Sequence, residues 1–205
     1  MILARDPLTP PKGLEGAVVA IGNFDGVHNG HAAVIACAEQ LAKKLGKPSA
    51  VLTFEPHPVD FFAGAGSVFR LTPEAERARC LARLGLDGSV VITFNADIAN
   101  LSAEDFVQDI LIRRLGVSGA VVGYDFHFGR NRGGSPAFLA EAGARHGFAV
   151  EIVPQVVADV DGHTEAVHSN AARKALEEGD VARAAKLLGH PWFAVGEVIH
   201  GEKLG

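Results

Sequence analysis

The stretch AVVAIGNFDGVHNGH (residues 17–31) decides the fold of this chain. An apolar run at 17–21 leads directly into a segment with three glycines, an aspartate and two histidines three residues apart. A short run that is apolar at every position predicts a strand buried on both faces of a sheet. Glycines after such a strand let the backbone approach a ligand closely, and the helix that we expect from near His31 would offer free N–H groups to an anion.

Four further apolar runs follow the first one, at 49–54, 89–94, 119–123 and 148–153. The stretches between them have helical periodicity, at 31–45, 73–84, 103–115 and 136–146. This alternation predicts an open, doubly wound α/β fold, Rossmann-like, with a parallel five-stranded sheet within about residues 15–186. Polar clusters directly follow the strands, so we expect the functional site at the carboxyl edge of the sheet.

The pattern changes after residue 154. Asp161 and Gly162 suit the turn of a β-hairpin. A helix is predicted from a Ser/Asn cap at 169–170 to Gly179, and a second one from Asp180 to Gly189. Residues 192–205 predict the first strand of another domain, which as an unpaired edge should be mobile or pair with a partner.

The composition limits the classes of protein to which this chain can belong. The chain has 205 residues, 48% of them hydrophobic and 21% charged, with a net charge of −5. These values are typical of a globular protein and give no basic face for nucleic acid, and no apolar run is long enough to cross a membrane. We expect no signal peptide in the first residues, and we expect Cys37 and Cys80 to be buried thiols. We therefore expect a cytoplasmic monomer or weak oligomer that binds small molecules.

The glycine-rich segment predicts a phosphate site. His28 and His31 can both donate hydrogen bonds to phosphate oxygens and stabilise charge that grows in a transition state. The segment lacks the lysine of a P-loop and the G-x-G-x-x-G of a dinucleotide site. Two other interpretations stay open, namely that the histidines only cap a helix or that they bind zinc, although no third ligand has suitable spacing.

The motif GNFDGVHNGH resembles that of the HxGH nucleotidyltransferases, in the form found in prokaryotic bifunctional riboflavin kinase/FMN adenylyltransferases (FAD synthetases). The resemblance continues in order through TFEPHP (53–58), RLT (70–72), FNADIANLSAEDFV (94–107), GYDFHFGRNRGG (123–134) and LLGHPWFAVGEVIHG (187–201). H-x-G-H alone is a moderate signal. Its combination with T-F-x-P-H-P and G-x-D-F-x-F-G is highly specific.

The resemblance implies a flavin region in the loops after the second and fourth predicted strands. Two prolines stiffen TFEPHP, which suits a wall for a flat aromatic ring. In the other loop, two glycines permit close backbone approach and two arginines offer positive charge. The expected flavin-binding residues are Phe54, Pro56, His57, Pro58, Phe62, Asp125, Phe128 and Arg130.

The phosphate region departs from the family at VHSNAAR (167–173), where the family usually has I-S-S-T-x-x-R. Ser169 and Arg173 match this pattern, whereas His168 and Asn170 replace a Ser and a Thr. The resemblance gives His28, His31 and Arg173 as catalytic residues. The expected ATP- and phosphate-binding residues are Gly22, Asn23, Phe24, Gly26, Gly30, His168, Ser169 and Asn170.

The implied activity is FMN adenylyltransferase, which makes FAD and pyrophosphate from FMN and ATP with Mg²⁺ and needs no protein metal ligand. Residues 1–186 would form this domain, and residues 187–205 a linker and the start of a riboflavin kinase domain. We expect no kinase activity from these 205 residues, although a longer parent protein would have it. Two alternatives remain, a flavin- or nucleotide-binding module with weakened or lost catalysis and an adenylyltransferase with another acceptor.

Overall fold

The protein, described by a computed structural model over residues 1–198, is built on one parallel six-stranded sheet. The strand order is β1-β4-β3-β2-β5-β6. The strands are β1 (Ile2–Arg5), β2 (Val18–Ile21), β3 (Ser49–Glu55), β4 (Gly88–Thr93), β5 (Gly119–Gly123) and β6 (Ala149–Val153). The chain leaves β2 toward β3 and later returns to the other side of β2 as β5. This reversal of strand order creates a crevice at the carboxyl ends of β2 and β5.

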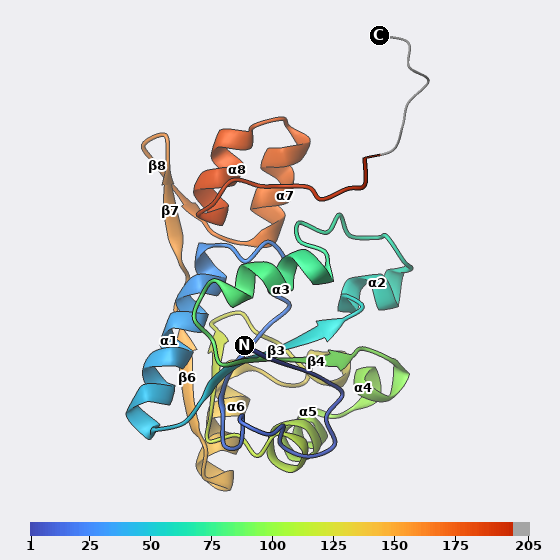
Figure 1. The fold of residues 1–205 in the computed structure, drawn as a ribbon, viewed down its shortest axis with the longest axis vertical. Helices are drawn as coiled ribbons and strands as arrows, with labels where there is room; N and C mark the ends of the chain where they lie inside the picture. The colour runs from blue at the N-terminus through green and yellow to red at the C-terminus, as the bar shows by residue number, and fades with distance from the viewer. Residues whose placement is uncertain (199–205) are drawn as a thin grey trace.

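Two hydrophobic layers cover the sheet, because successive residues of a buried strand point to opposite faces. Val18 and Ala20 of β2 pack with α1 (Asn29–Leu45) and with Leu81 of α3 (Glu74–Ala82). Val19 and Ile21 face the other layer, which includes the continuous α5–η1 segment and α6. Figure 1 shows the sheet between these two groups of helices. The remaining bounds are α2 (Pro58–Ala63), α4 (Ala96–Asn100), α5 (Ala103–Asp105), η1 (Phe106–Arg114), η2 (Arg130–Arg132) and α6 (Pro136–His146).

The predicted α/β class is confirmed, but the number of strands was wrong by one. Strand β1 pairs in parallel with β4, with Ile2 opposite Gly88. It is a four-residue edge strand whose side chains are mostly exposed, so it has no buried run that a sequence pattern could reveal. The five other strands lie where the apolar runs predicted them.

A small unit follows the sheet, as the sequence predicted. Strands β7 (Val157–Val160) and β8 (His163–Ala166) pair antiparallel around Asp161 and Gly162, which both have positive φ. Helices α7 (Ser169–Glu177) and α8 (Val181–Leu188) pack on this hairpin (Figure 1). Residues 192–198 form no strand, and the rest of the predicted barrel strand lies outside the described residues. No helix within residues 1–198 is long and apolar enough to span a membrane.

Candidate active site

A cavity of about 700 Å³ opens at the crevice between β2 and β5. Its walls come from the loop after β2, the start of α1, the loop after β5 and residues 167–169 before and at the start of α7. These segments are far apart in sequence and meet because parallel strands end at the same edge. The site therefore lies where the sequence analysis expected it.

The loop after β2 is held in a strained conformation. Gly26 has φ +84°, and a side chain there would collide with Leu71. Phe24 and Val27 also have positive φ, at 52° and 42°, which is unusual for any residue with a Cβ and more so for the β-branched Val27. Such strain persists only where surrounding contacts fix the backbone, and it concentrates at functional sites.

Helix α1 begins earlier than predicted, because His28 acts as its N-cap. The Nδ1 atom of His28 accepts a hydrogen bond from the His31 backbone N–H at 3.2 Å. The helix then starts at Asn29, so Gly30 belongs to its first turn rather than to the loop. Since Nδ1 is an acceptor, a neutral His28 ring carries its proton on Nε2, where it is available as a donor.

The two histidines stack on each other. Their ring centroids are 3.6 Å apart and the planes differ by 15°. Burial lowers the pKa of His28 to about 4, with a further decrease from nearby His168. Burial and the neighbouring His28 also lower the pKa of His31 well below its ordinary value. Both rings are therefore neutral N–H donors at pH 7, and the Nδ1 atom of His31 is buried without a partner.

Helix α7 is also capped by a histidine, which corrects the predicted Ser/Asn cap. His168 Nδ1 accepts a hydrogen bond from the Ala171 N–H at 3.1 Å. Asn170 instead accepts a hydrogen bond from Arg173 Nη1 at 2.7 Å. The ring of His168 lies on the cavity wall, so its Nε2 atom, like that of His28, is free to donate to a ligand.

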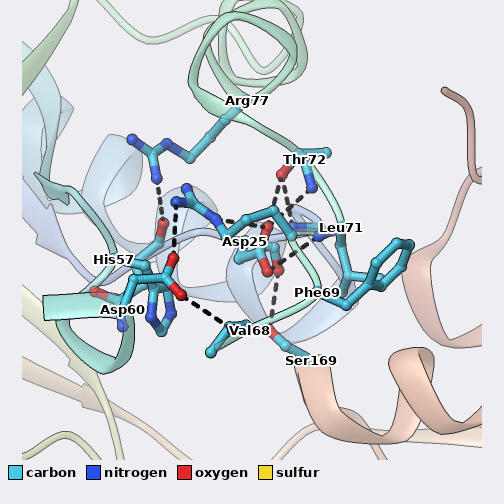
Figure 2. Close-up of polar contacts among 12 residues, drawn as sticks. Asp25, His57, Asp60, Val68, Phe69, Leu71, Thr72, Arg77 and Ser169 are labelled. Atoms are coloured by element: carbon cyan, nitrogen blue, oxygen red, sulfur yellow. Dashed lines mark hydrogen bonds and ion pairs between the residues drawn. The ribbon is translucent and has the colours of Figure 1, made fainter. Parts of the chain in front are cut away.

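The buried carboxylate of Asp25 connects the glycine-rich loop to two other segments (Figure 2). It accepts hydrogen bonds from the backbone N–H groups of Leu71 (3.2 Å) and Thr72 (2.9 Å) and from Arg173 Nη2. The Ser169 hydroxyl donates to the Asp25 carbonyl oxygen at 2.9 Å. Asp25 therefore fixes the loop against α7 and against residues 71–72, and it was absent from the predicted site residues.

A second ionic network lies beside the Asp25 cluster. Glu55 at the end of β3 forms ion pairs with Arg70 (3.1 Å) and with the fully buried Arg77 (2.9 Å). Burial alone would raise the pKa of Glu55, but its hydrogen bonds and attraction to the two arginines lower it. Arg77 also donates to the Asn23 carbonyl oxygen at 3.3 Å, and Figure 2 shows it above His57 and Asp60. The network thus fixes the backbone of the first loop residues.

The other end of the cavity is apolar and aromatic. Phe54 closes one wall from β3, and Phe62, which is 70% exposed, stands at the edge on α2. The ring of Phe94 contacts both, with centroid distances of 6.0 and 5.9 Å. Phe128 adds a further aromatic wall from the loop after β5. This end suits a flat ring system rather than a charged group.

The structure separates the two arginines of the loop after β5. Arg132 is among the residues that line the cavity and Arg130 is not, although both are exposed. Asn131 and Arg132 have positive φ, at 55° and 56°. The sequence analysis treated both arginines as available cations and placed Arg130 among the flavin-binding residues, whereas Arg132 is the one that borders the cavity.

Thirteen of the nineteen predicted site residues line the cavity: Gly22, Asn23, Phe24, His28, Gly30, His31, Phe54, Pro58, Phe62, Asp125, Phe128, His168 and Ser169. Phe24 is fully buried, and its ring packs against that of His31 at 5.1 Å between centroids, so we expect it to support the histidine rather than to contact phosphate.

Six predicted residues do not line the cavity. Gly26, Asn170 and Arg173 belong to the cluster around Asp25, and Arg173 points to that carboxylate instead of the open space. Pro56 is exposed, and His57 is buried as the N-cap of α2, accepting from the Val59 N–H. Arg130 is the sixth.

Within the part of the chain that the structure describes, no three His, Cys, Asp or Glu side chains are grouped as a metal site. Cys37 and Cys80 are free thiols and are partly exposed rather than fully buried. The acidic groups close to the glycine-rich loop are already paired with arginines.

The model of the FAD synthetase family matches residues 11–169 of this chain. A bifunctional riboflavin kinase/FMN adenylyltransferase from Pseudomonas fluorescens is 43% identical over 189 residues, which cover 92% of this chain and 59% of that protein. The protein of the same name from Escherichia coli K12 is 38% identical over 191 residues, covering 93% of this chain and 60% of that one.

A solved structure has a similar fold. It is titled a macrolide-efflux protein from Streptococcus pneumoniae, and it aligns with a TM-score of 0.74 at 29% sequence identity. The alignment covers 94% of this chain and 61% of that one. The chain thus spans about 60% of the length of the proteins that it matches.

Proposed function

The chain belongs to the FAD synthetase family, and on this basis we propose that it transfers the adenylyl group of ATP to FMN. The products are FAD and pyrophosphate. The single observation that supports this most is the division of the cavity into two ends. One end has two stacked neutral histidines at the start of α1, and the other has an aromatic wall.

The histidine end fits the triphosphate of ATP. The first turn of α1 offers backbone N–H groups and the positive end of the helix dipole, and His28 and His168 each offer an Nε2 donor. His31 contributes its buried ring beside them. Gly30 leaves room for the His28 ring at the start of α1, because a side chain at residue 30 would come too close to that ring.

The aromatic end fits the isoalloxazine ring of FMN. Phe54, Phe62 and Phe128 supply apolar surface, while Asp125 supplies a polar group at the edge. Arg132 is placed to neutralise an anionic group of a ligand. These assignments would place the phosphate of FMN between the ring site and the histidines, next to the α-phosphorus of ATP.

In the reaction, an oxygen of the FMN phosphate forms a bond to the α-phosphorus of ATP. The bond from that phosphorus to the oxygen bridging to the β-phosphorus breaks, and pyrophosphate leaves with the electron pair. The protein positions two anions and stabilises the negative charge that develops, chiefly through N–H donors that are already in place. Arg173 acts by holding Asp25, and through it the loop that carries His28.

We propose MgATP as the nucleotide substrate, with Mg²⁺ held mainly by phosphate oxygens, since Asp25 and Glu55 beside the glycine-rich loop are paired with arginines. The proposed partners are therefore the small molecules FMN and MgATP, and the proposed location is the cytoplasm. Riboflavin kinase activity is named for the longer relatives and is not proposed for residues 1–198.

The proposal is tested by incubating the purified chain with FMN and MgATP and separating the products by chromatography. FAD and pyrophosphate should form in equal amounts. Matched reactions with nicotinate mononucleotide or phosphopantetheine in place of FMN should give no adenylylated product. Binding of FMN and ATP without FAD would show a binding module, and product from another acceptor alone would show a different adenylyltransferase.

A further inference from the structure

The segment that follows α8 makes two direct contacts with the candidate active site. His190 Nε2 lies 3.0 Å from the carbonyl oxygen of Gly26, and Trp192 Nε1 donates to the carbonyl oxygen of Leu71 at 3.0 Å. Both residues come after residue 169, where the family match ends. In Figure 1 this dark red segment leaves the end of α8 and crosses α7 in this view.

The Gly26 carbonyl belongs to the peptide plane that sets φ of Val27. That plane is held at its nitrogen, because the Val27 N–H donates to the Phe24 carbonyl oxygen at 3.2 Å. His190 holds the same plane at its oxygen. Val27 has φ +42° and directly precedes His28, so this plane helps to fix the backbone that carries the His28 ring.

The Leu71–Thr72 peptide plane is held in the same manner. The Thr72 N–H donates to Asp25 at 2.9 Å, and the Leu71 carbonyl oxygen accepts from Trp192 at 3.0 Å. The indole also packs against Phe69, with centroids 5.9 Å apart. A third hydrogen bond joins the end of α8 to the start of α1, where Asn29 Nδ2 donates to the Lys186 carbonyl oxygen at 3.0 Å.

We infer that His190 is a positioning residue for adenylyl transfer, which holds the Gly26–Val27 peptide so that His28 faces the triphosphate. Trp192 supports it by holding Leu71 against Asp25. The inference rests on the proposed function. It predicts that loss of the His190 contact impairs the use of MgATP and leaves FMN binding unchanged, because both contacts are at the histidine end. The Nδ1 atom of His190 lies 2.9 Å from the Pro191 carbonyl oxygen, so both ring nitrogens face acceptors and a neutral ring has one N–H for the two. The inference assigns this N–H to Nε2, since the Gly26 carbonyl oxygen only accepts.

Two substitutions that introduce the same amide group on side chains of different length test this requirement for a donor. In His190→Gln the amide nitrogen reaches about as far as Nε2, whereas in His190→Asn it falls short of the Gly26 oxygen. We expect His190→Asn and His190→Ala to lower kcat/KM for MgATP by roughly three- to tenfold, the range for one lost hydrogen bond. His190→Gln should stay within about twofold of the unaltered chain, and the Kd for FMN should change in none of them.

A measurement without catalysis separates this inference from the proposed function. Amide hydrogen exchange of the peptide covering residues 22–31 should be faster in His190→Asn than in His190→Gln, at equal thermal stability of the two variants. If the unaltered chain makes no FAD but this exchange difference is seen, the positioning role of the contact stands and the proposed activity fails. If Gln and Asn behave alike in both assays, or if both weaken FMN binding, His190 does not act through Gly26.

Discussion

Asp25 and Arg173 are 148 positions apart in the sequence, yet the carboxylate of Asp25 accepts a hydrogen bond from the guanidinium of Arg173. Asp25 is almost completely buried, and the side chain of Arg173 is only 13% exposed. The pair joins the loop after β2 to α7, so the geometry of the histidine end depends on a contact between the two parts of the chain. Replacing Arg173 leaves the buried Asp25 carboxylate without its closest cation, and replacing Asp25 leaves the mostly buried Arg173 guanidinium without its carboxylate.

Arg173→Gln should lower the free energy of unfolding by about 3 kcal/mol, because it leaves the Asp25 carboxylate without its closest cation. Asp25→Asn should have a comparable effect. The double variant should be less harmful than the sum of the two, with a coupling of roughly 1–3 kcal/mol in urea unfolding. Strict additivity would show that the two side chains do not stabilise each other.

The stability of the protein should fall as the pH is lowered from 6.5 to about 4. The ordinary pKa of 6.5 applies to His28 in the unfolded chain, and its pKa in the folded protein is about 4. The unfolded state therefore binds more protons in this window, and acid favours unfolding, by roughly 3 kcal/mol for this residue once the pH is below 4.

His28→Asn should flatten this pH dependence, because asparagine also caps helices but does not titrate in this range. Some slope should remain, since the pKa values of His31 and His57 are lowered as well. His163→Asn on the exposed strand β8 is the matched control and should keep the original slope. An unchanged slope in His28→Asn would contradict the lowered pKa of His28.

Phe62→Ala should weaken FMN binding by about 1 kcal/mol or more, because it removes aromatic surface from the cavity edge. Phe69→Ala provides a control in which an exposed phenylalanine outside the cavity is removed. Flavin fluorescence titration measures both. Equal Kd values for FMN in the two variants would exclude Phe62 from the flavin site.

The two arginines after β5 give a matched pair of variants. Arg132→Ala should weaken ligand binding by roughly 1.5–3 kcal/mol, the range for a hydrogen bond to a charged group. Arg130→Ala should have little effect, since that side chain is outside the cavity. The reverse order of effects, measured by calorimetry with FMN and with MgATP, would restore the original prediction for Arg130.

The sequence predicted the parts of the fold that depend on local patterns. Fully apolar runs predicted five of the six strands, and glycine and aspartate predicted the hairpin turn at Asp161 and Gly162. Strand β1 was missed because it is an exposed edge that forms only by pairing with β4. The start of α1 was placed too late because a histidine is an uncommon N-cap.

The candidate site was predicted in outline, because motifs placed the histidines and aromatic residues at the ends of strands. Asp25 was missed although it lies within GNFDGVHNGH, since its role depends on Leu71, Thr72 and Arg173. The sequence offered both Arg130 and Arg132 as cations, and it does not show which of two nearby side chains borders the cavity. His190 lies within the quoted motif LLGHPWFAVGEVIHG (187–201) but was assigned no role, because its partner is the Gly26 carbonyl oxygen.

The fate of labelled phosphorus tests the central claim most directly, because it shows which bond of ATP breaks. The chain is incubated with FMN and Mg²⁺ and with ATP labelled at either the α- or the γ-phosphorus. The account predicts that the α-label appears in FAD and the γ-label in pyrophosphate. A γ-label transferred to flavin, or an α-label retained entirely in unreacted ATP or ADP, would contradict adenylyl transfer to FMN.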